Sequence, residues 1–212
     1  MEKIEGQVKD LIEMLEKGEI TKKEVLVEMK KRGLYHHADE PIPGIFAISG
    51  AIVWGVLCFL PVICKVLDLN IAEIPSIEIS PEITYLTLFF AVVMTPTFIF
   101  PSRLRSKRGG TGGDETIVII KEGPYRIVRH PEFLAGLAWF IALPILFNHF
   151  LDLPFTILSI FGEIAVVTGL CLQARHEEKI NIKKWGDTYA HYMKDVPRFN
   201  FIKGLWNLRK KR

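Results

Sequence analysis

Two polar segments of the sequence contain the residue types that most readily perform chemistry. The first runs from 123 to 131 and reads Gly-Pro-Tyr-Arg-Ile-Val-Arg-His-Pro, which brings arginines close to the titratable imidazole of His130. The second contains the carboxylates of Glu177 and Glu178 and ends near Arg198. Carboxylates beside arginines can accept a proton or orient a charged substrate, but they also form ordinary solvated salt bridges. The sequence leaves both interpretations open, and the arginines of the first segment could equally anchor a helix to phosphates.

Four further features bear on chemistry. Glu163 falls inside an apolar run, where an ionisable group is costly and becomes a functional candidate, the alternative being a hydrogen bond to a neighbouring helix. Tyr189 and Tyr192 share one side of an amphipathic helix, and we expect them to be interfacial belt residues. The glycine-rich stretch 109–113 fits neither a P-loop nor a dinucleotide-binding fingerprint, so we interpret it as a hinge. The cysteines lie in apolar runs without metal-ligand spacing, so we expect no metal site.

The elements that must position these segments are apolar helices. The chain has 212 residues, of which 49% are hydrophobic and 24% charged, and its mean hydropathy is +0.23. The apolar residues gather in runs of about 20 with the charges between them, which is typical of a membrane protein and excludes a disordered chain or a coiled-coil rod. We therefore predict an all-α integral membrane protein with about four transmembrane helices, at residues 44–67, 83–101, 133–151 and 153–174. Proline suits the first turn of a helix, so we expect the helix of the third span to begin near Pro131.

The loops between these runs predict the orientation of the chain in the membrane. Residues 68–82 contain acidic side chains and no lysine or arginine, whereas residues 102–131 and the last residues are rich in both. By the positive-inside rule, the basic loop and both termini are cytoplasmic. We expect a multi-pass protein of the cell membrane in a prokaryote, or of the endoplasmic reticulum in a eukaryote. The net charge of +3 is too small and too scattered to indicate a nucleic-acid partner.

Residues 1–40 predict a cytosolic helical hairpin and linker ahead of a membrane domain at 41–212. Charged and apolar residues alternate at helical spacing, and Gly18 interrupts the pattern. Thr21 followed by Glu24 is a capping-box signal for a second helix that closes at Gly33. The hairpin is either a solubilising appendage that docks on the rest of the chain or a module similar to the helix–turn–helix units of prokaryotic membrane proteins.

Taken together, the two polar segments resemble the superfamily of isoprenylcysteine carboxyl methyltransferases and phospholipid N-methyltransferases. The resemblance rests on Gly-Pro-Tyr-x-x-x-Arg-His-Pro at 123–131 and on the glutamate pair, the Trp-Gly-x-x-Tyr-x-x-Tyr run at 185–192 and the Val-Pro-Arg run at 196–198. It covers about residues 80–205, and the sequence at 201–204 is similar to the tail of the carboxyl methyltransferase branch. The resemblance implies an S-adenosylmethionine-dependent membrane enzyme whose cytoplasmic cofactor pocket is built without a Rossmann domain.

The resemblance also implies roles for individual residues. Substrate-binding residues would be Gln173 and Arg175, although the carboxyl methyltransferases tend to have an arginine at the position of Gln173. Arg175 lies about 200° around a helix from Gln173 and cannot replace it without a kink. Phe133 stands where tyrosine is usual, and Ala135 stands where glycine is usual. The residues expected to border the cofactor are Ile117, Val118, Ile119, Ile120, Tyr125, His130, Pro131, Glu132, Phe133 and Glu177.

The possible methyl acceptors make different demands on the chain. A carboxylate is already a nucleophile at neutral pH and needs only a cation, such as Arg175 or Arg198, to orient it. A phospholipid amine must lose a proton, and Glu177 or Glu178 is the nearest group able to accept it. Glu177, Glu178 and Arg198 are therefore the candidate catalytic residues.

We expect methyl transfer to a lipid or to a lipidated small molecule or protein, and the resemblance favours isoprenylcysteine carboxyl methylation. Three alternatives stay open. They are N-methylation of a phospholipid amine, an NADPH-dependent membrane reductase with a similar carboxyl-terminal pattern, and a non-enzymatic scaffold whose arginines bind anionic lipids.

Overall fold

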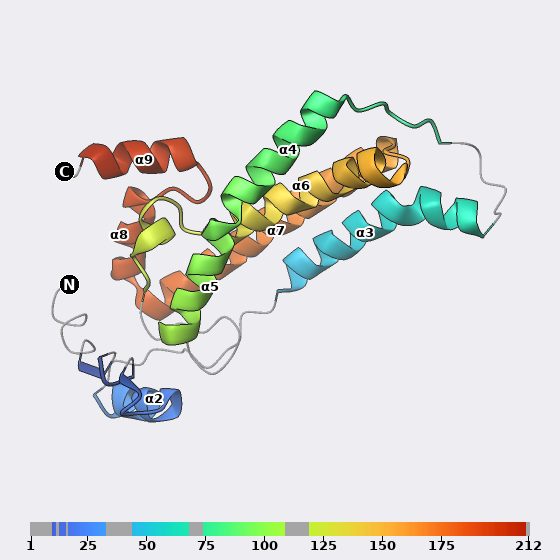
Figure 1. Cartoon of the computed structure of the whole chain (residues 1–212). Coiled ribbons are helices and arrows are strands. Elements are labelled where there is room, and N and C mark those ends of the chain that lie inside the picture. The colour runs from blue at the N-terminus through green and yellow to red at the C-terminus, as the bar shows by residue number, and fades with distance from the viewer. Residues whose placement is uncertain are drawn as a thin grey trace. The chain divides into compact units, whose positions relative to one another are not determined.

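The structure is a computed structural model that describes residues 10–11, 13–15, 17–32, 44–67, 74–108 and 119–210 (Figure 1). The chain divides into two compact units, each of which is described by itself. Unit 1 comprises Met1–Pro43, Ile99–Pro131 and His176–Arg212, and unit 2 comprises Gly44–Phe98 and Glu132–Arg175. The described residues form helices, turns and loops, with one isolated antiparallel bridge between Ser76 and Thr156.

Among the described residues, four helical stretches are long and apolar enough to cross a membrane, which agrees with the predicted number. They are formed by α3 (Ile45–Val66), by α4 (Pro81–Met94) together with the start of α5 (Pro96–Arg108), by α6 (Pro131–Leu151) and by α7 (Ile157–Trp185). The chain thus has the helices of a multi-pass membrane protein. α6 begins at Pro131 as predicted, because the fixed φ angle and missing N–H of proline suit the first turn of a helix.

Two of the predicted spans differ in the structure. The expected span at 83–101 is two helices that meet at Thr95, because Pro96 has no N–H to continue the hydrogen-bond ladder. The span expected from residue 153 begins at Ile157, because the preceding residues are extended and the carbonyl of Phe155 accepts a hydrogen bond from the amide of Ile77. α7 then continues well beyond residue 174, since no helix-breaking residue occurs before Gly186, which adopts a positive φ of 53°.

Unit 2 is held together by close approach of α3 and α7. A Cβ atom on Gly169 would lie 2.6 Å from the carbonyl oxygen of Phe46 and 3.0 Å from the Cα of Gly50. Such small residues allow two helix backbones to pack tightly in an apolar environment. Next to this contact, Trp54 of α3 donates a hydrogen bond from Nε1 to Oε1 of Glu163 on α7, at 3.0 Å. The predicted alternative for Glu163, a hydrogen bond to a neighbouring helix, is therefore confirmed.

Unit 1 contains the shorter helices: α2 (Lys22–Lys31), the 3-10 helix η1 (Gly123–Arg126), α8 (Asp187–Asp195) and α9 (Phe201–Lys210). The capping box before α2 is confirmed, because the Thr21 amide donates to the Glu24 carboxylate at 2.7 Å and the Glu24 amide donates to the Thr21 hydroxyl at 3.3 Å. Arg32 also pairs with Asp10 at 2.9 Å. Residues 1–9 and Gly33 lie outside the described residues, so the complete amino-terminal hairpin stays a prediction.

Candidate functional site

The first polar segment turns sharply before it reaches His130. Gly123 begins η1 with a positive φ of 54°, and a Cβ atom there would also overlap the ring of Phe100, so two separate constraints favour glycine. Pro124 follows in the first turn of η1, and the next aromatic side chain, Tyr125, is buried. This turn directs residues 128–130 toward the second polar segment.

Hydrogen bonds to main-chain carbonyls join the two polar segments within unit 1. The amide of Arg129 donates to the carbonyl of Pro197 at 3.0 Å, and the amide of His130 donates to the carbonyl of Arg198 at 3.4 Å. A third bond runs from the hydroxyl of Tyr192 to the carbonyl of Tyr125, at 2.7 Å. The Arg-His-Pro and Val-Pro-Arg runs therefore lie side by side although they are far apart in the sequence.

Tyr189 and Tyr192 support this junction from α8. Both are buried with Val196, and Ile119 and Met193 pack against them. The expectation that they are interfacial belt residues is wrong, because both side chains are buried and the Tyr192 hydroxyl is bonded to the carbonyl of Tyr125 in the first polar segment. Burial raises the pKa of Tyr189 to about 12, so its phenol stays protonated at neutral pH.

At the junction, charged side chains form what we call the ionic cluster, which comprises Arg129, His130, Glu177, Glu178 and Arg198. Glu178 lies at the centre of the cluster. Nε of Arg129 donates a hydrogen bond to Oε1 of Glu178 at 2.9 Å, and Nη2 of Arg129 lies 2.8 Å from the same oxygen. Arg198 reaches Glu178 with Nε, at 2.9 Å from Oε1, and with a second nitrogen that binds Oε2. The remaining Arg129 nitrogen, Nη1, donates to the carbonyls of Met193 and Val196 at 2.8 and 2.6 Å.

His130 connects the two carboxylates. Its Nδ1 lies 3.3 Å from Oε2 of Glu177, and its Nε2 lies 3.5 Å from Oε1 of Glu178. Burial by itself would lower the pKa of His130, but the interactions with Glu177 and Glu178 outweigh it and raise the pKa above its ordinary value. His130 is therefore held in its charged form to higher pH than a free histidine.

Exposure divides the ionic cluster into a buried interior and an accessible rim. The side chains of Arg129, His130, Glu177 and Glu178 are at most 10% exposed, whereas that of Arg198 is 30% exposed. The interpretation as a solvated salt-bridge group is therefore wrong for these residues. With His130 protonated, three cations face two carboxylates, so the cluster can bind an anionic group, and Arg198 is the member best placed to meet one.

The other predicted site residues fall into three groups. Ile117 and Val118 lie outside the described residues. Ile119, Ile120 and Pro131 belong to unit 1, where Ile120 and Pro131 are buried. Four residues belong to unit 2: the half-buried Glu132 and Phe133, the buried Gln173 and the exposed Arg175.

Arg129 is the residue whose importance the sequence did not predict. At this position the sequence suggests either a helix anchor or a cation beside His130, yet the Arg129 guanidinium bonds both to Glu178 and to the carbonyls of Met193 and Val196. Its place in the Arg-His-Pro run is the feature of the sequence that could have indicated its importance. Its hydrogen-bond partners, however, lie as far as 67 residues away in the sequence.

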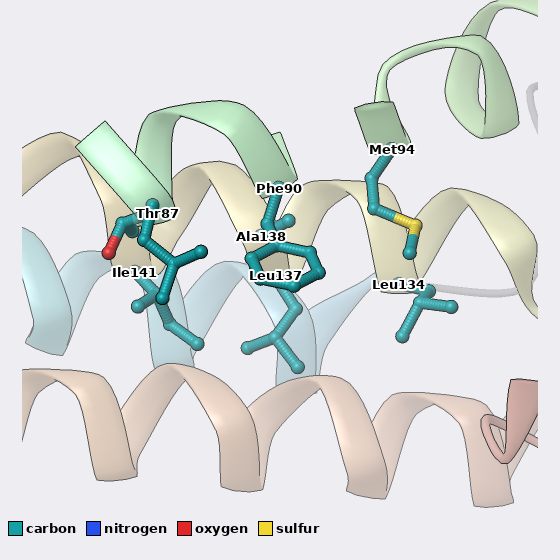
Figure 2. Close-up of a pocket in the computed structure, with 8 residues that line it drawn as sticks. Thr87, Phe90, Met94, Leu134, Leu137, Ala138 and Ile141 are labelled. Atoms are coloured by element: carbon teal, nitrogen blue, oxygen red, sulfur yellow. The ribbon is translucent and has the colours of Figure 1, made fainter. Parts of the chain in front are cut away.

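A separate apolar cavity of about 340 Å³ lies in unit 2, between α4 and α6. Figure 2 shows Thr87, Phe90 and Met94 of α4 facing Leu134, Leu137 and Ile141 of α6. The Thr87 hydroxyl donates to the carbonyl of Ile83 at 2.6 Å, so its hydrogen-bonding capacity is directed to its own helix. The cavity therefore offers hydrocarbon contact rather than polar recognition.

Comparison with known protein families, with curated proteins and with solved structures found no match. Within the described part of the chain, no group of three or more histidine, cysteine, aspartate or glutamate side chains is arranged to hold a metal ion.

Proposed function

We propose that this chain is an integral membrane S-adenosylmethionine-dependent methyltransferase that acts on a lipid-borne acceptor. The observation that supports the proposal is the ionic cluster, because the residues that resemble a methyltransferase site are the ones that meet there. Arg129 and His130 come from the first polar segment, and Glu177, Glu178 and Arg198 come from the second. A chance similarity of two short motifs would not require them to share buried contacts.

The chemistry of these residues fits the cofactor. S-adenosylmethionine supplies a methyl group as part of a positively charged sulfonium. Glu177 would hold a polar end of the molecule, since a buried carboxylate is a strong acceptor for ammonium and hydroxyl donors. Tyr125, His130 and Pro131 would border it together with Glu132 and Phe133, and a further part of the expected pocket wall, residues 117–120, precedes η1 in the sequence.

The charge balance of the ionic cluster favours an acceptor carboxylate over an acceptor amine. A protonated His130 leaves one excess positive charge, and Arg198 is accessible to orient an anion. A carboxylate acceptor also needs no base. An amine acceptor would need one, and Glu178 is poorly suited because two guanidinium groups stabilise its ionised form.

Glu178 accordingly acts as a positioning residue that fixes Arg129 and Arg198. Glu177 and Arg198 are left as the groups that would contact cofactor and acceptor. The proposed reaction is therefore carboxyl methylation of the type found with isoprenylcysteine, in which binding and orientation contribute most of the catalysis.

The experiment is methyl transfer from tritium-labelled S-adenosylmethionine by the detergent-purified full chain. The acceptors are N-acetyl-S-farnesylcysteine, which offers a carboxylate, and phosphatidylethanolamine, which offers an amine. We expect label only in the first, and we expect mild base to release it as methanol because a methyl ester hydrolyses whereas an N-methyl group does not.

Two variants make the test specific for the site. Glu177→Gln should abolish most of the transfer, whereas Glu28→Gln, which alters a glutamate on α2, should leave it unchanged. Base-stable label in phosphatidylethanolamine would replace the proposed acceptor with an amine. Absence of transfer to either acceptor, together with absence of S-adenosylhomocysteine binding, would refute the methyltransferase assignment.

A further inference from the structure

The last helix of the chain, α9, is held against unit 1 by one of its faces. Asn200 caps it, since Oδ1 accepts a hydrogen bond from the amide of Lys203 at 2.9 Å. Asn207 donates from Nδ2 to the carbonyl of Asp195 at 2.8 Å. Between these contacts, Gly204 is buried so closely against Ile127 that a Cβ atom would overlap the carbonyl oxygen of Ile127.

The opposite face of α9 is apolar and uncovered among the described residues. Ile202 is 81% exposed, Leu205 is 44% exposed and Trp206 is 58% exposed. These positions follow the i, i+3, i+4 spacing that places side chains on one side of a helix. A helix of ten residues is marginal by itself in water, so its attachment through Asn200, Gly204 and Asn207 is what presents this face in a fixed orientation.

Cations accompany the apolar face. Lys203, Arg209 and Lys210 are exposed, and Nζ of Lys210 lies 5.6 Å from the centre of the Trp206 ring. The sequence continues with Lys211 and Arg212, and it contains no aspartate or glutamate after Asp195. The end of the chain is therefore uniformly basic, which matches an anionic surface and disfavours a basic one.

We propose that α9 lies on an anionic lipid surface, with Ile202, Leu205 and Trp206 inserted at the headgroup boundary and the surrounding lysines and arginines bound to lipid phosphates. An exposed apolar stripe beside cations is the pattern of an interfacial amphipathic helix, and tryptophan is favoured at the depth of the headgroups. In the sequence, α9 follows α7, which is long and apolar enough to cross a membrane, with only α8 between them. The proposal does not depend on the activity proposed above.

The test uses the full chain in lipid nanodiscs and the fluorescence of Trp206, which is obtained by subtracting the emission of a Trp206→Phe variant from that of the wild type. Bromine atoms on lipid chains quench nearby tryptophans. One nanodisc contains brominated phosphatidylglycerol and ordinary phosphatidylcholine, and the other contains brominated phosphatidylcholine and ordinary phosphatidylglycerol, at the same mole fraction of brominated lipid.

We expect the Trp206 emission to be quenched in both nanodiscs, and roughly twofold more strongly when the anionic lipid carries the bromine, because several cations enrich that lipid around α9. The double variant Arg209→Gln/Lys210→Gln should remove the difference between the two nanodiscs. The matched double variant Arg126→Gln/Lys194→Gln also removes one exposed arginine and one exposed lysine from unit 1, and it should retain the difference.

Two results would overturn the proposal. Equal quenching by both brominated lipids would show that α9 contacts lipid without selecting anionic headgroups. No quenching by either lipid would show that α9 does not lie on the bilayer, and the exposed face would then have to serve a protein partner or a second copy of the chain.

Discussion

Arg129 and Glu178 form a buried ion pair, with Nη2 of the arginine 2.8 Å from Oε1 of the glutamate. The same carboxylate binds Arg198, so one side chain of α7 holds both polar segments of the sequence together. Arg129 and Glu178 have lost most of their contact with water, and their charges are tolerated because each replaces that contact for the other. The ionic cluster is therefore both the proposed site and a main structural support of unit 1.

Replacing Glu178 by glutamine should destabilise the protein strongly. The substitution keeps the shape of the side chain but leaves Arg129 as a buried charge without its carboxylate, which typically costs about 3–5 kcal/mol. Denaturant unfolding of the purified protein in detergent measures the loss. Glu28→Gln is the control, because Glu28 pairs with Arg32 on the exposed side of α2 and its loss should have little effect. Similar losses for the two variants would contradict the structural role of Glu178.

Stability should fall as the pH rises above the ordinary pKa of histidine, about 6.5. The folded protein holds the pKa of His130 above that value, so the stabilisation is fully present at lower pH and disappears as the pH rises through the raised pKa. Melting temperatures between about pH 6 and pH 9 should show this decline, and His130→Asn should flatten it. His191→Asn, at an exposed histidine of α8, should keep the wild-type slope. An identical pH dependence in wild type and His130→Asn would exclude the effect.

Gly204→Ala should destabilise the docking of α9, even though alanine favours helices over glycine. The added methyl group would overlap the carbonyl of Ile127, and the backbone on both sides would have to move. Gly136→Ala in α6 is the matched control, since a Cβ atom there meets nothing within 4 Å, and it should stabilise its helix by up to about 1 kcal/mol. Hydrogen exchange at 201–210 should accelerate only in the first variant. Unchanged exchange there would contradict the close contact of α9.

Trp54 and Glu163 should be energetically coupled. Glu163 accepts a hydrogen bond from Trp54 through Oε1, and its buried Oε2 has no hydrogen-bond partner among the described residues. Trp54→Phe, Glu163→Leu and the double variant form a cycle in which each single change removes the bond, and it should give a coupling free energy of about 0.6–1.7 kcal/mol, as for other hydrogen bonds between membrane helices. Coupling near zero would mean that the bond adds no stability, and Glu163 would then call for a functional explanation.

Features encoded locally could be predicted from the sequence. The apolar runs predicted the four described helices that are long and apolar enough to cross a membrane, because length and hydropathy alone decide that property, and Pro131 and the Thr21–Glu24 pair marked helix starts by their own chemistry. The end of α7 could not be predicted from the same runs, because a helix continues through polar residues until a residue such as Gly186 stops it.

Contacts between distant residues could not be predicted in this way. Glu178 and Arg129 are 49 residues apart, and no periodicity indicates that they meet. For the same reason Tyr192 was misassigned to the interface: its spacing on α8 was evident, but its bond to the first polar segment was not. The sequence supplied the candidate residues, whereas their division into buried side chains and an accessible rim required the structure.

The central claim, that this chain binds S-adenosylmethionine through the ionic cluster, is tested most directly by melting temperature. The detergent-purified protein is measured with S-adenosylhomocysteine, with NADPH and with neither. A ligand at about 100 times its dissociation constant stabilises by about 2.7 kcal/mol, which gives a measurable shift. We predict a shift with S-adenosylhomocysteine alone, and its loss in Glu177→Gln. A shift with NADPH alone, or no shift with either ligand, would contradict the account.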